Sequence, residues 1–125
     1  MADKKKILLV DDVVTFAKLI QVSLEQTGEF EVRIEKRGAF VVPVAQEYRP
    51  HAILLDVMMP HMDGPAVART LQEDEKTARV PVAFLTSMVS RDETGPEGRV
   101  IRGFPFMAKP VTPQEIRNFV KKLVG

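Results

Sequence analysis

The sequence predicts an α/β protein built on one doubly wound parallel sheet of five strands, with five helices distributed over its two faces. Short apolar runs alternate along the chain with longer segments of helical periodicity, which is typical of βαβ units. Two of the runs, residues 52–55 and 80–85, contain no charged or polar side chain. Such runs are expected of central parallel strands that are buried on both faces.

The first strand is expected at residues 7–10, which form the first apolar run. A helix is expected over residues 13–27, because its apolar side chains recur at i, i+3 and i+4 and so share one face. That face comprises Phe16, Ala17, Ile20 and Leu24. Gly28 follows it, and glycine commonly ends a helix.

The second strand is expected at residues 30–35, where apolar and charged side chains alternate. A period of two suits a strand with one exposed face. The second helix is expected over residues 39–48. It contains Pro43, which must lie in the first turn or kink the helix.

The third strand, at residues 52–55, is followed by a third helix expected from Gly64 or Pro65 to about Glu75. The fourth strand is expected at residues 80–85. Both strands are continuously apolar and are therefore assigned to the centre of the sheet.

Residues 91–102 fit a fourth helical segment poorly, because glycines and a proline interrupt it at residues 95–98. Residues 103–107 predict the fifth strand. Pro105 lies inside this strand and indicates an edge position, since proline cannot donate a hydrogen bond to a neighbouring strand.

The last helix has a well-defined start. Thr112 can cap it, Pro113 suits the first helical position, and Glu115 completes a capping box. Its buried stripe is expected to comprise Ile116, Phe119, Val120 and Leu123. With strands one, three and four central and strands two and five at the edges, the predicted order is the flavodoxin-like 2-1-3-4-5.

The composition indicates one soluble domain spanning residues 1–125, with a cytoplasmic location as the natural expectation. The net charge is +1, from 18 basic and 17 acidic residues, so charge gives no case for nucleic acid or an anionic membrane as the main partner. There is no cysteine, and no apolar run approaches the about 20 residues of a membrane span.

Polar side chains follow the ends of several predicted strands. Ligands of open α/β sheets bind beyond the carboxyl ends of the strands, where the strand order reverses, here between strands one and three. Asp11 and Asp12 follow strand one and Asp56 follows strand three, while Thr86 and Lys109 follow strands four and five. We therefore expect three carboxylates, a hydroxyl group and an ammonium group on one rim.

Three carboxylates held together repel one another, by about 4 kcal/mol for a pair 4 Å apart at an effective dielectric constant near 20. Such a cluster either retains a proton or binds a cation. Oxygen ligands alone favour a hard ion, Mg²⁺ first, with Ca²⁺ or Mn²⁺ behind it. Lys109 and Thr86 would then face a phosphoryl group, and an aspartate such as Asp56 can itself be the nucleophile that accepts it.

In this combination the sequence resembles the receiver domain of two-component response regulators, of the chemotaxis-regulator-like single-domain kind. The motifs that carry the resemblance are Leu9-Val10-Asp11-Asp12, the run from Leu54 to Gly64 with Asp56 inside it, Leu85-Thr86-Ser87 and Lys109-Pro110. The resemblance covers essentially the whole chain. Each motif alone is weak, whereas the ordered set is highly specific.

The resemblance implies a role for each residue. Asp56 would be the phosphoacceptor, and Mg²⁺ would be bound directly by Asp12, largely through water by Asp11, and by the backbone carbonyl of Met58 as well as by Asp56. Thr86 would move to hydrogen-bond the phosphoryl group. Lys109 would pair with the phosphoryl group, and its bond to Pro110 would be cis. Phe106 would be an aromatic switch residue.

Simpler interpretations remain open for several of these residues. Asp11 or Asp12 can cap the first helix, and Asp63 with Gly64 is better explained as a turn and a helix start. His61 is expected to be an exposed neighbour of the site. Phe106 is equally well explained by ordinary packing on an edge strand.

The sequence departs from the family pattern at Met58 and Met88, positions that often bear polar side chains. Two apolar thioethers near the acyl phosphate should slow its hydrolysis, so Met58→Asn is expected to shorten its half-life. The interrupted segment at residues 91–102 belongs to the family's usual output face, which also includes the fifth strand and the fifth helix. Recognition of a downstream partner is therefore expected to differ.

The resemblance implies a phosphorylated signalling protein rather than an enzyme, fed by a sensor histidine kinase or a phosphotransfer protein and acting on an effector protein. It would catalyse at most its own phosphorylation and dephosphorylation. An aspartate-nucleophile phosphatase usually has a second carboxylate two residues after the nucleophile, where this chain has Met58. A flavodoxin would have a phosphate-binding loop rich in glycine, serine and threonine after strand one, and Asp12-Val13-Val14 is not such a loop. A pseudo-receiver, or a receiver cut from a hybrid kinase or transcription factor at Gly125, stays open.

Overall fold

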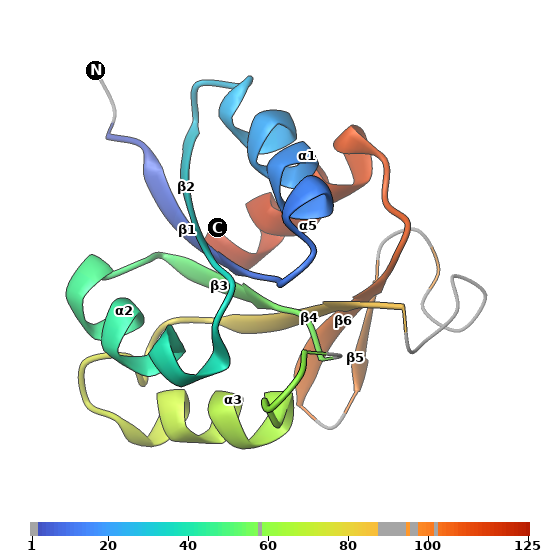
Figure 1. Cartoon of the computed structure of the whole chain (residues 1–125). Coiled ribbons are helices and arrows are strands. Elements are labelled where there is room, and N and C mark those ends of the chain that lie inside the picture. Colours follow the sequence, from blue (N-terminus) through green and yellow to red (C-terminus); the bar gives the residue numbers. More distant parts are fainter. Residues whose placement is uncertain (1–2, 58, 88–94, 96–97, 102) are drawn as a thin grey trace.

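A mixed β-sheet runs through the middle of the molecule and separates two layers of helices (Figure 1). The computed structural model describes residues 3–57, 59–87, 95, 98–101 and 103–125. The strands are β1 (Lys5–Val10), β2 (Phe30–Glu35), β3 (Ala52–Leu55), β4 (Val82–Thr86), β5 (Arg99–Ile101) and β6 (Phe104–Ala108). The helices are α1 (Val14–Glu25), α2 (Val41–Tyr48), α3 (Gly64–Glu73) and α5 (Pro113–Val124), with a 3₁₀ turn, η1, at Gly38–Phe40.

The predicted strand order is confirmed. Five strands pair in parallel in the order β2-β1-β3-β4-β6, and β6 is the strand predicted as the fifth. Helices α1 and α5 cover one face of the sheet, and α2 and α3 cover the other (Figure 1). Pro43 lies in the first turn of α2, where its missing N–H costs the helix no hydrogen bond.

A short antiparallel strand, β5, corrects the prediction for residues 91–102. It pairs with β6, placing Val100 opposite Pro105, so the expectation that Pro105 lies on the edge strand is wrong. Most of the predicted fourth helical segment falls outside the described residues, and its described end is this strand. The described part of the chain therefore contains four α-helices, not five.

Two glycines explain the hairpin of β5 and β6. Gly103 lies between the strands with φ of +87°, a conformation that other residues rarely adopt. At Gly98, with φ of +83°, a β-carbon would lie 2.6 Å from the carbonyl oxygen of Phe106. The backbone thus approaches the sheet at a distance that only glycine permits. The same glycines weaken a helix here.

The core consists of two apolar layers, one on each face of the sheet. Alternate side chains of β1 enter opposite layers, with Ile7 and Leu9 beneath α1 and α5, and Leu8 and Val10 above α2 and α3. All four are at most 1% exposed. Complete burial of such a side chain contributes about 1.5–3 kcal/mol, so both layers hold β1 firmly in place.

Helix α5 begins as predicted. The Thr112 hydroxyl accepts a hydrogen bond from the backbone N–H of Glu115, and the Glu115 carboxylate accepts one from the backbone N–H of Thr112. Ile116, Phe119 and Val120 are buried, and the apolar face packs on the sheet. No helix in the described part of the chain is long and apolar enough to cross a membrane.

Candidate functional site

Three carboxylates meet at the carboxyl ends of β1 and β3. Asp11, Asp12 and Asp56 each offer one oxygen, and these oxygens all lie within 4.8 Å of one another. Asp11 is 1% exposed and Asp56 is 5% exposed, whereas Asp12 is exposed to solvent. The predicted convergence of these acids is therefore present in the structure.

The pairing of β1 with β3 brings the acids together. Val10 lies opposite Leu55 in the register of the two strands, and the next residues are Asp11 and Asp56. The backbone N–H of Asp56 donates to the carbonyl oxygen of Val10 at 2.9 Å. Two parallel strands that end at the same level thus deliver two carboxylates to the same edge.

Asp11 also holds the turn before α1, but neither Asp11 nor Asp12 caps this helix, because its N-cap residue is Val13, which makes no side-chain cap hydrogen bond. Its Oδ1 accepts a hydrogen bond of 2.9 Å from the backbone N–H of Val13, immediately before α1. Its Oδ2 accepts one from Nζ of Lys109 at 2.7 Å. One buried carboxylate therefore holds the turn that leads into α1 and also holds a cation of the site.

Lys109 supplies the positive charge of the cluster. Its Nζ lies 2.7 Å from Oδ2 of Asp11 and 3.3 Å from Oδ2 of Asp56, and its side chain is only 15% exposed. Opposite charges about 3 Å apart attract by roughly 5 kcal/mol at an effective dielectric constant near 20, before the cost of removing them from water. This attraction offsets the repulsion between the two buried acids.

The backbone of Lys109 is held by the end of β4. Its N–H donates to the carbonyl oxygen of Thr86 at 2.9 Å, and the bond between Lys109 and Pro110 is cis, as the sequence predicted. The Thr86 side chain is fully buried at the last position of β4, opposite Ala108 of β6. Strands one, three, four and six therefore all contribute a residue to this rim.

The cluster fits a small divalent cation. An octahedral Mg²⁺ holds oxygens at about 2.0–2.1 Å, so its ligand oxygens lie about 3–4 Å apart. The three carboxylate oxygens, all within 4.8 Å of one another, need only small side-chain adjustments to reach that spacing. Asp12 is the exposed member, and it gives the ion a route from solvent.

Other residues predicted near the site have structural roles or fall outside the description. Phe106 is half-buried, and its ring packs against that of Phe84 with centroids 4.8 Å apart, while its role as a switch residue stays a prediction. Asp63 caps α3, accepting from the backbone N–H of Ala66 at 3.1 Å, which confirms the helix-start interpretation. His61 is exposed, as expected. The side chains at positions 58 and 88 lie outside the described residues, so the effect of Met58 and Met88 stays a prediction.

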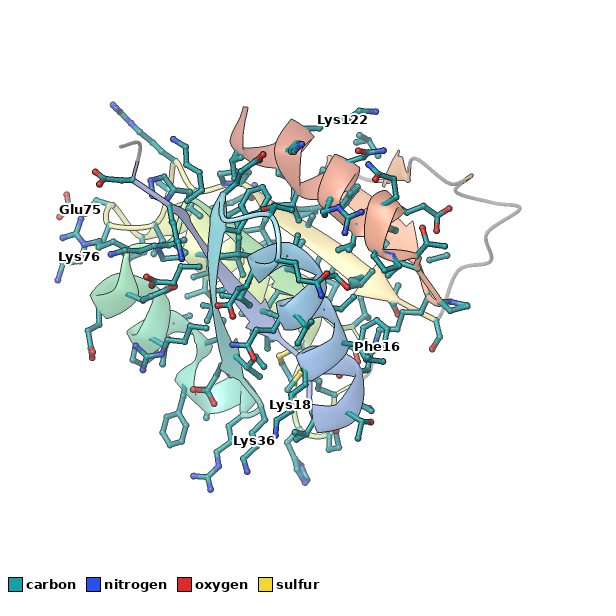
Figure 2. The ribbon with its side chains drawn as sticks, turned by 90° about the horizontal axis from the view of Figure 1, so that it is seen from above. Phe16, Lys18, Lys36, Glu75, Lys76 and Lys122 are labelled. Atoms are coloured by element: carbon teal, nitrogen blue, oxygen red, sulfur yellow. The ribbon has the colours of Figure 1, made fainter. Side chains whose placement is uncertain are left out.

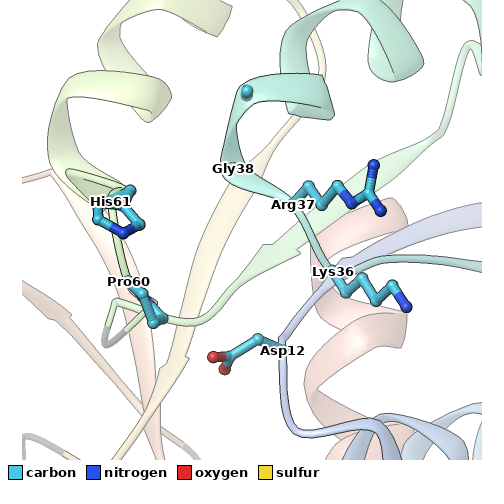
Figure 3. Close-up of a pocket in the computed structure, with 7 residues that line it drawn as sticks. Asp12, Lys36, Arg37, Gly38, Pro60 and His61 are labelled. Carbon is cyan, nitrogen blue, oxygen red and sulfur yellow. The ribbon is translucent and has the colours of Figure 1, made fainter.

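A pocket of about 280 Å³ opens beside Asp12 (Figure 3). The loop after β2, with Lys36 and Arg37, forms one wall, and Pro60 with His61 forms the other. The Asp12 carboxylate faces the space between the two loops, while the Lys36 and Arg37 side chains extend away from it (Figure 3). Asp12 is the member of the acidic cluster that lines this pocket. Sequence reasoning placed His61 beside the site but did not identify the opposite wall at Lys36 and Arg37.

One aromatic residue beside the site was also missed as a functional candidate. Nζ of Lys109 lies 4.2 Å from the centroid of the Phe16 ring. The helical periodicity assigned Phe16 to the apolar face of α1, and it does pack against the core. The overlooked signal is its position in the first turn of the helix that follows Asp11 and Asp12.

Comparisons with known proteins agree with this geometry. The sequence matches the family described as response regulator receiver domain over residues 7–121. It is 31% identical to response regulator Rre1 of Synechocystis, covering 100% of this chain and 54% of that protein. It is 36% identical to response regulator PleD of Caulobacter vibrioides, over 85% of this chain and 23% of that protein. The chain thus spans about half the length, or less, of these relatives.

Solved structures show the same fold. A putative response regulator from Chloroflexus aurantiacus is 27% identical and superposes with a TM-score of 0.82 over 98% of each chain. The receiver domain of sensor histidine kinase PA1611 from Pseudomonas aeruginosa, which has a magnesium ion coordinated in its active-site cleft, is 26% identical. It superposes with a TM-score of 0.79 over 98% of this chain and 99% of that one. The chain belongs to the response regulator receiver domain family.

Proposed function

We propose that this protein is the phosphoacceptor of a two-component phosphorelay and that Asp56 is the residue phosphorylated. The observation that carries the proposal is the placement of Asp56: a buried carboxylate beside two further acids, with the Lys109 ammonium 3.3 Å from its Oδ2. Developing negative charge on a phosphoryl group here would meet a fixed cation in a poorly solvated site.

The reaction is a transfer of a phosphoryl group from a histidine of a partner. One carboxylate oxygen of Asp56 attacks phosphorus, and the new O–P bond forms as the P–N bond to the imidazole breaks. The electron pair of the P–N bond stays on the imidazole nitrogen, which takes a proton from solvent. The products are an acyl phosphate on Asp56 and a neutral histidine on the donor.

The acidic cluster is proposed as the magnesium site. Asp12 and Asp56 would bind Mg²⁺ directly, Asp11 largely through water, and the backbone carbonyl of Met58 would be a further ligand. Held by these residues, Mg²⁺ would supply positive charge that offsets the charge of the phosphoryl oxygens. The magnesium ion in the related receiver domain of PA1611 supports this assignment.

Lys109, Thr86 and Phe106 are proposed to respond to the phosphoryl group. Lys109 pairs with a phosphoryl oxygen, and the Thr86 hydroxyl hydrogen-bonds another after moving toward it. The added charge of about −1.5 to −2 drives the change. Phe106 lies two residues before Ala108, the β6 partner of Thr86, so a shift at the end of β4 can reach its ring.

The proposed partners follow from this chemistry. A sensor histidine kinase or a phosphotransfer protein supplies the phosphoryl group. A downstream effector protein binds the face to which β6 and α5 contribute, while residues 91–102, the remaining part of the predicted output face, lie mostly outside the described residues. We propose that residues 1–125 act as one receiver domain in the cytoplasm, with no direct contact to nucleic acid and no separate enzymatic substrate.

The decisive test is the intact mass of the protein after incubation with Mg²⁺ and phosphoramidate. Wild type should gain about 80 Da, the mass of one phosphoryl group on the modified side chain. Asp56→Ala should gain nothing, while Asp63→Ala, which removes an exposed carboxylate outside the cluster, should gain the same adduct as wild type. Chelation of the metal with EDTA should abolish the gain. An adduct on Asp56→Ala, or none on wild type, would contradict the proposal.

A further inference from the structure

We propose that Phe16 is a positioning residue for phosphoryl transfer, holding the Lys109 ammonium against the face of its ring. The inference rests on the proposed function of Asp56, because it assigns Lys109 to the phosphoryl group. It adds Phe16, which lies on α1 outside the acidic and Lys/Thr motifs, to the residues that hold the Lys109 ammonium in place.

The geometry is that of a close cation–π contact. Nζ of Lys109 lies 4.2 Å from the ring centroid of Phe16, well inside the roughly 6 Å at which such contacts matter. The Lys109 side chain is 15% exposed, so water screens the contact weakly. Desolvated cation–π contacts are the strong ones.

The ring complements the two acids that also hold Lys109. An ammonium group has three N–H donors, and those of Lys109 have Asp11 and Asp56 as acceptors at 2.7 and 3.3 Å. The Phe16 ring offers Lys109 a further attractive surface that carries no net charge. A fourth carboxylate in that place would repel the anionic phosphodonor, whereas the ring does not.

The contact between Lys109 and the ring also does not depend on Asp56, the acid that the proposed reaction modifies. Once Asp56 carries a phosphoryl group, its carboxylate charge is gone and the Lys109 N–H group that donated to it must turn to a new oxygen. The attraction to the ring of Phe16 does not depend on the charge state of Asp56. The ammonium therefore keeps its contact with the ring while its hydrogen-bond partner at Asp56 changes.

Phe16 is itself well anchored. It lies in the first turn of α1, half-buried, and packs against the core layer between the sheet and helices α1 and α5. Figure 2 places it on α1 toward the same end of the sheet as Lys36, which follows β2. A side chain fixed to the core from α1 thus steadies a lysine that follows β6.

The first test measures the rate of phosphorylation by phosphoramidate in saturating Mg²⁺. Because this donor is a small molecule, the measured rate does not depend on the docking of a partner protein. Phe16→Leu keeps an apolar side chain but removes the ring, and it should slow phosphorylation by about two- to thirtyfold, the range given by an exposed to a desolvated cation–π contact. Phe16→Tyr keeps the ring face and should restore the rate. Leu19→Ala, at a residue of the same helix that is 66% exposed, is the matched control and should react like wild type.

The second test observes the contact itself, in unphosphorylated protein without metal. The ε-methylene protons of Lys109, held over the ring, should resonate upfield of the other lysines in a ¹H–¹³C spectrum, and Lys109→Arg identifies the signal by removing it. The upfield shift should vanish in Phe16→Leu and persist in Phe16→Tyr. A general loss of structure in Phe16→Leu would instead change resonances throughout the spectrum. In that case the measurement is repeated with Phe16→Met.

Both tests can overturn the inference. Phosphorylation of Phe16→Leu at the wild-type rate, or failure of Phe16→Tyr to restore it, would show that the ring does not position Lys109 for transfer. A Lys109 signal unchanged in Phe16→Leu would show that the contact does not exist in solution. Absence of any adduct on wild type would contradict the proposed function instead, and the spectrum would still decide whether Phe16 holds the ammonium.

Discussion

At both ends of the sheet a cation lies over the face of an aromatic ring close to a carboxylate. At the carboxyl end Lys109 lies 4.2 Å from the Phe16 ring centroid. At the amino end Lys6 lies 5.3 Å from the centroid of Tyr48, whose hydroxyl donates to Oε2 of Glu31 at 2.7 Å. The same three kinds of group are present in each cluster.

The two ends differ in burial. At the carboxyl end Asp11 and Asp56 are at most 5% exposed and share one lysine. At the amino end Arg33, which also lies over Tyr48, pairs with Glu47 at 4.0 Å, and their side chains are 43% and 79% exposed. Water therefore screens the charges around Tyr48, whereas the charges around Lys109 act on one another and on any anion that enters.

Removing one cation from each end of the sheet tests this difference in burial and has the largest expected effect. In metal-free buffer, Lys109→Met leaves two buried carboxylates without their ammonium and should lower the free energy of unfolding by about 3 kcal/mol. Arg33→Met removes an exposed partner and should lower it by less than about 1 kcal/mol. Urea titrations followed by circular dichroism measure both values.

Magnesium provides the control for the Lys109→Met prediction. Because the ion brings positive charge to the acids that lost their lysine, Mg²⁺ should raise the stability of Lys109→Met more than that of wild type. It should affect Arg33→Met and wild type equally. Equal destabilisation by the two substitutions would mean that burial does not separate the two ends of the sheet.

The difference between the two ends was only partly predictable from the sequence. Asp11 and Asp56 could be placed together, because both directly follow apolar runs and parallel strands present their carboxyl ends on one edge. The start of α5 was predictable because Thr112 and Glu115 interact locally. These inferences depend on periodicity and on short sequence separations.

What could not be predicted depends on contacts between distant parts of the chain. Strand β5 exists because the backbone at Gly98 approaches the Phe106 carbonyl, and no local pattern records that approach. The periodicity of α1 places Phe16 in the core equally well with or without Lys109 on its ring. The cluster around Tyr48 joins α2 to β1 and β2 and likewise has no sequence motif.

Asp12, the exposed acid at the carboxyl end, tests whether the acids there bind Mg²⁺ specifically. Asp12→Asn should weaken Mg²⁺ binding about tenfold, because a neutral amide replaces one of the charged oxygens of the proposed metal site. Asp63→Asn is the matched control: it also neutralises an exposed acid nearby, but an asparagine can still cap α3. Isothermal titration with MgCl₂ should give wild-type affinity for Asp63→Asn. Equal losses for both variants would indicate that Mg²⁺ responds only to the overall negative charge of the rim.

Tyr48 gives the smallest expected effect and tests the amino end alone. Partial burial, followed by the hydrogen bond to Glu31, raises the pKa of the Tyr48 phenol above its ordinary value of 10.0. The folded protein therefore favours the protonated phenol, and this contribution to stability is complete below pH 10 and is lost as the pH rises above it. Below that pH, Tyr48→Phe should lower the free energy of unfolding by about 0.5–1 kcal/mol through loss of the hydrogen bond.

The pH dependence separates this role from ordinary packing. As the pH rises from about 10 toward 11, the unfolded wild type releases its phenol proton while the folded form retains it, so the stability difference between wild type and Tyr48→Phe should shrink. Phosphorylation by phosphoramidate at neutral pH should be identical in the two proteins. A stability difference that does not shrink between pH 8 and about 11 would contradict the linkage between folding and the phenol proton, and a difference near zero at every pH would show that Tyr48 stabilises the amino end through its ring alone.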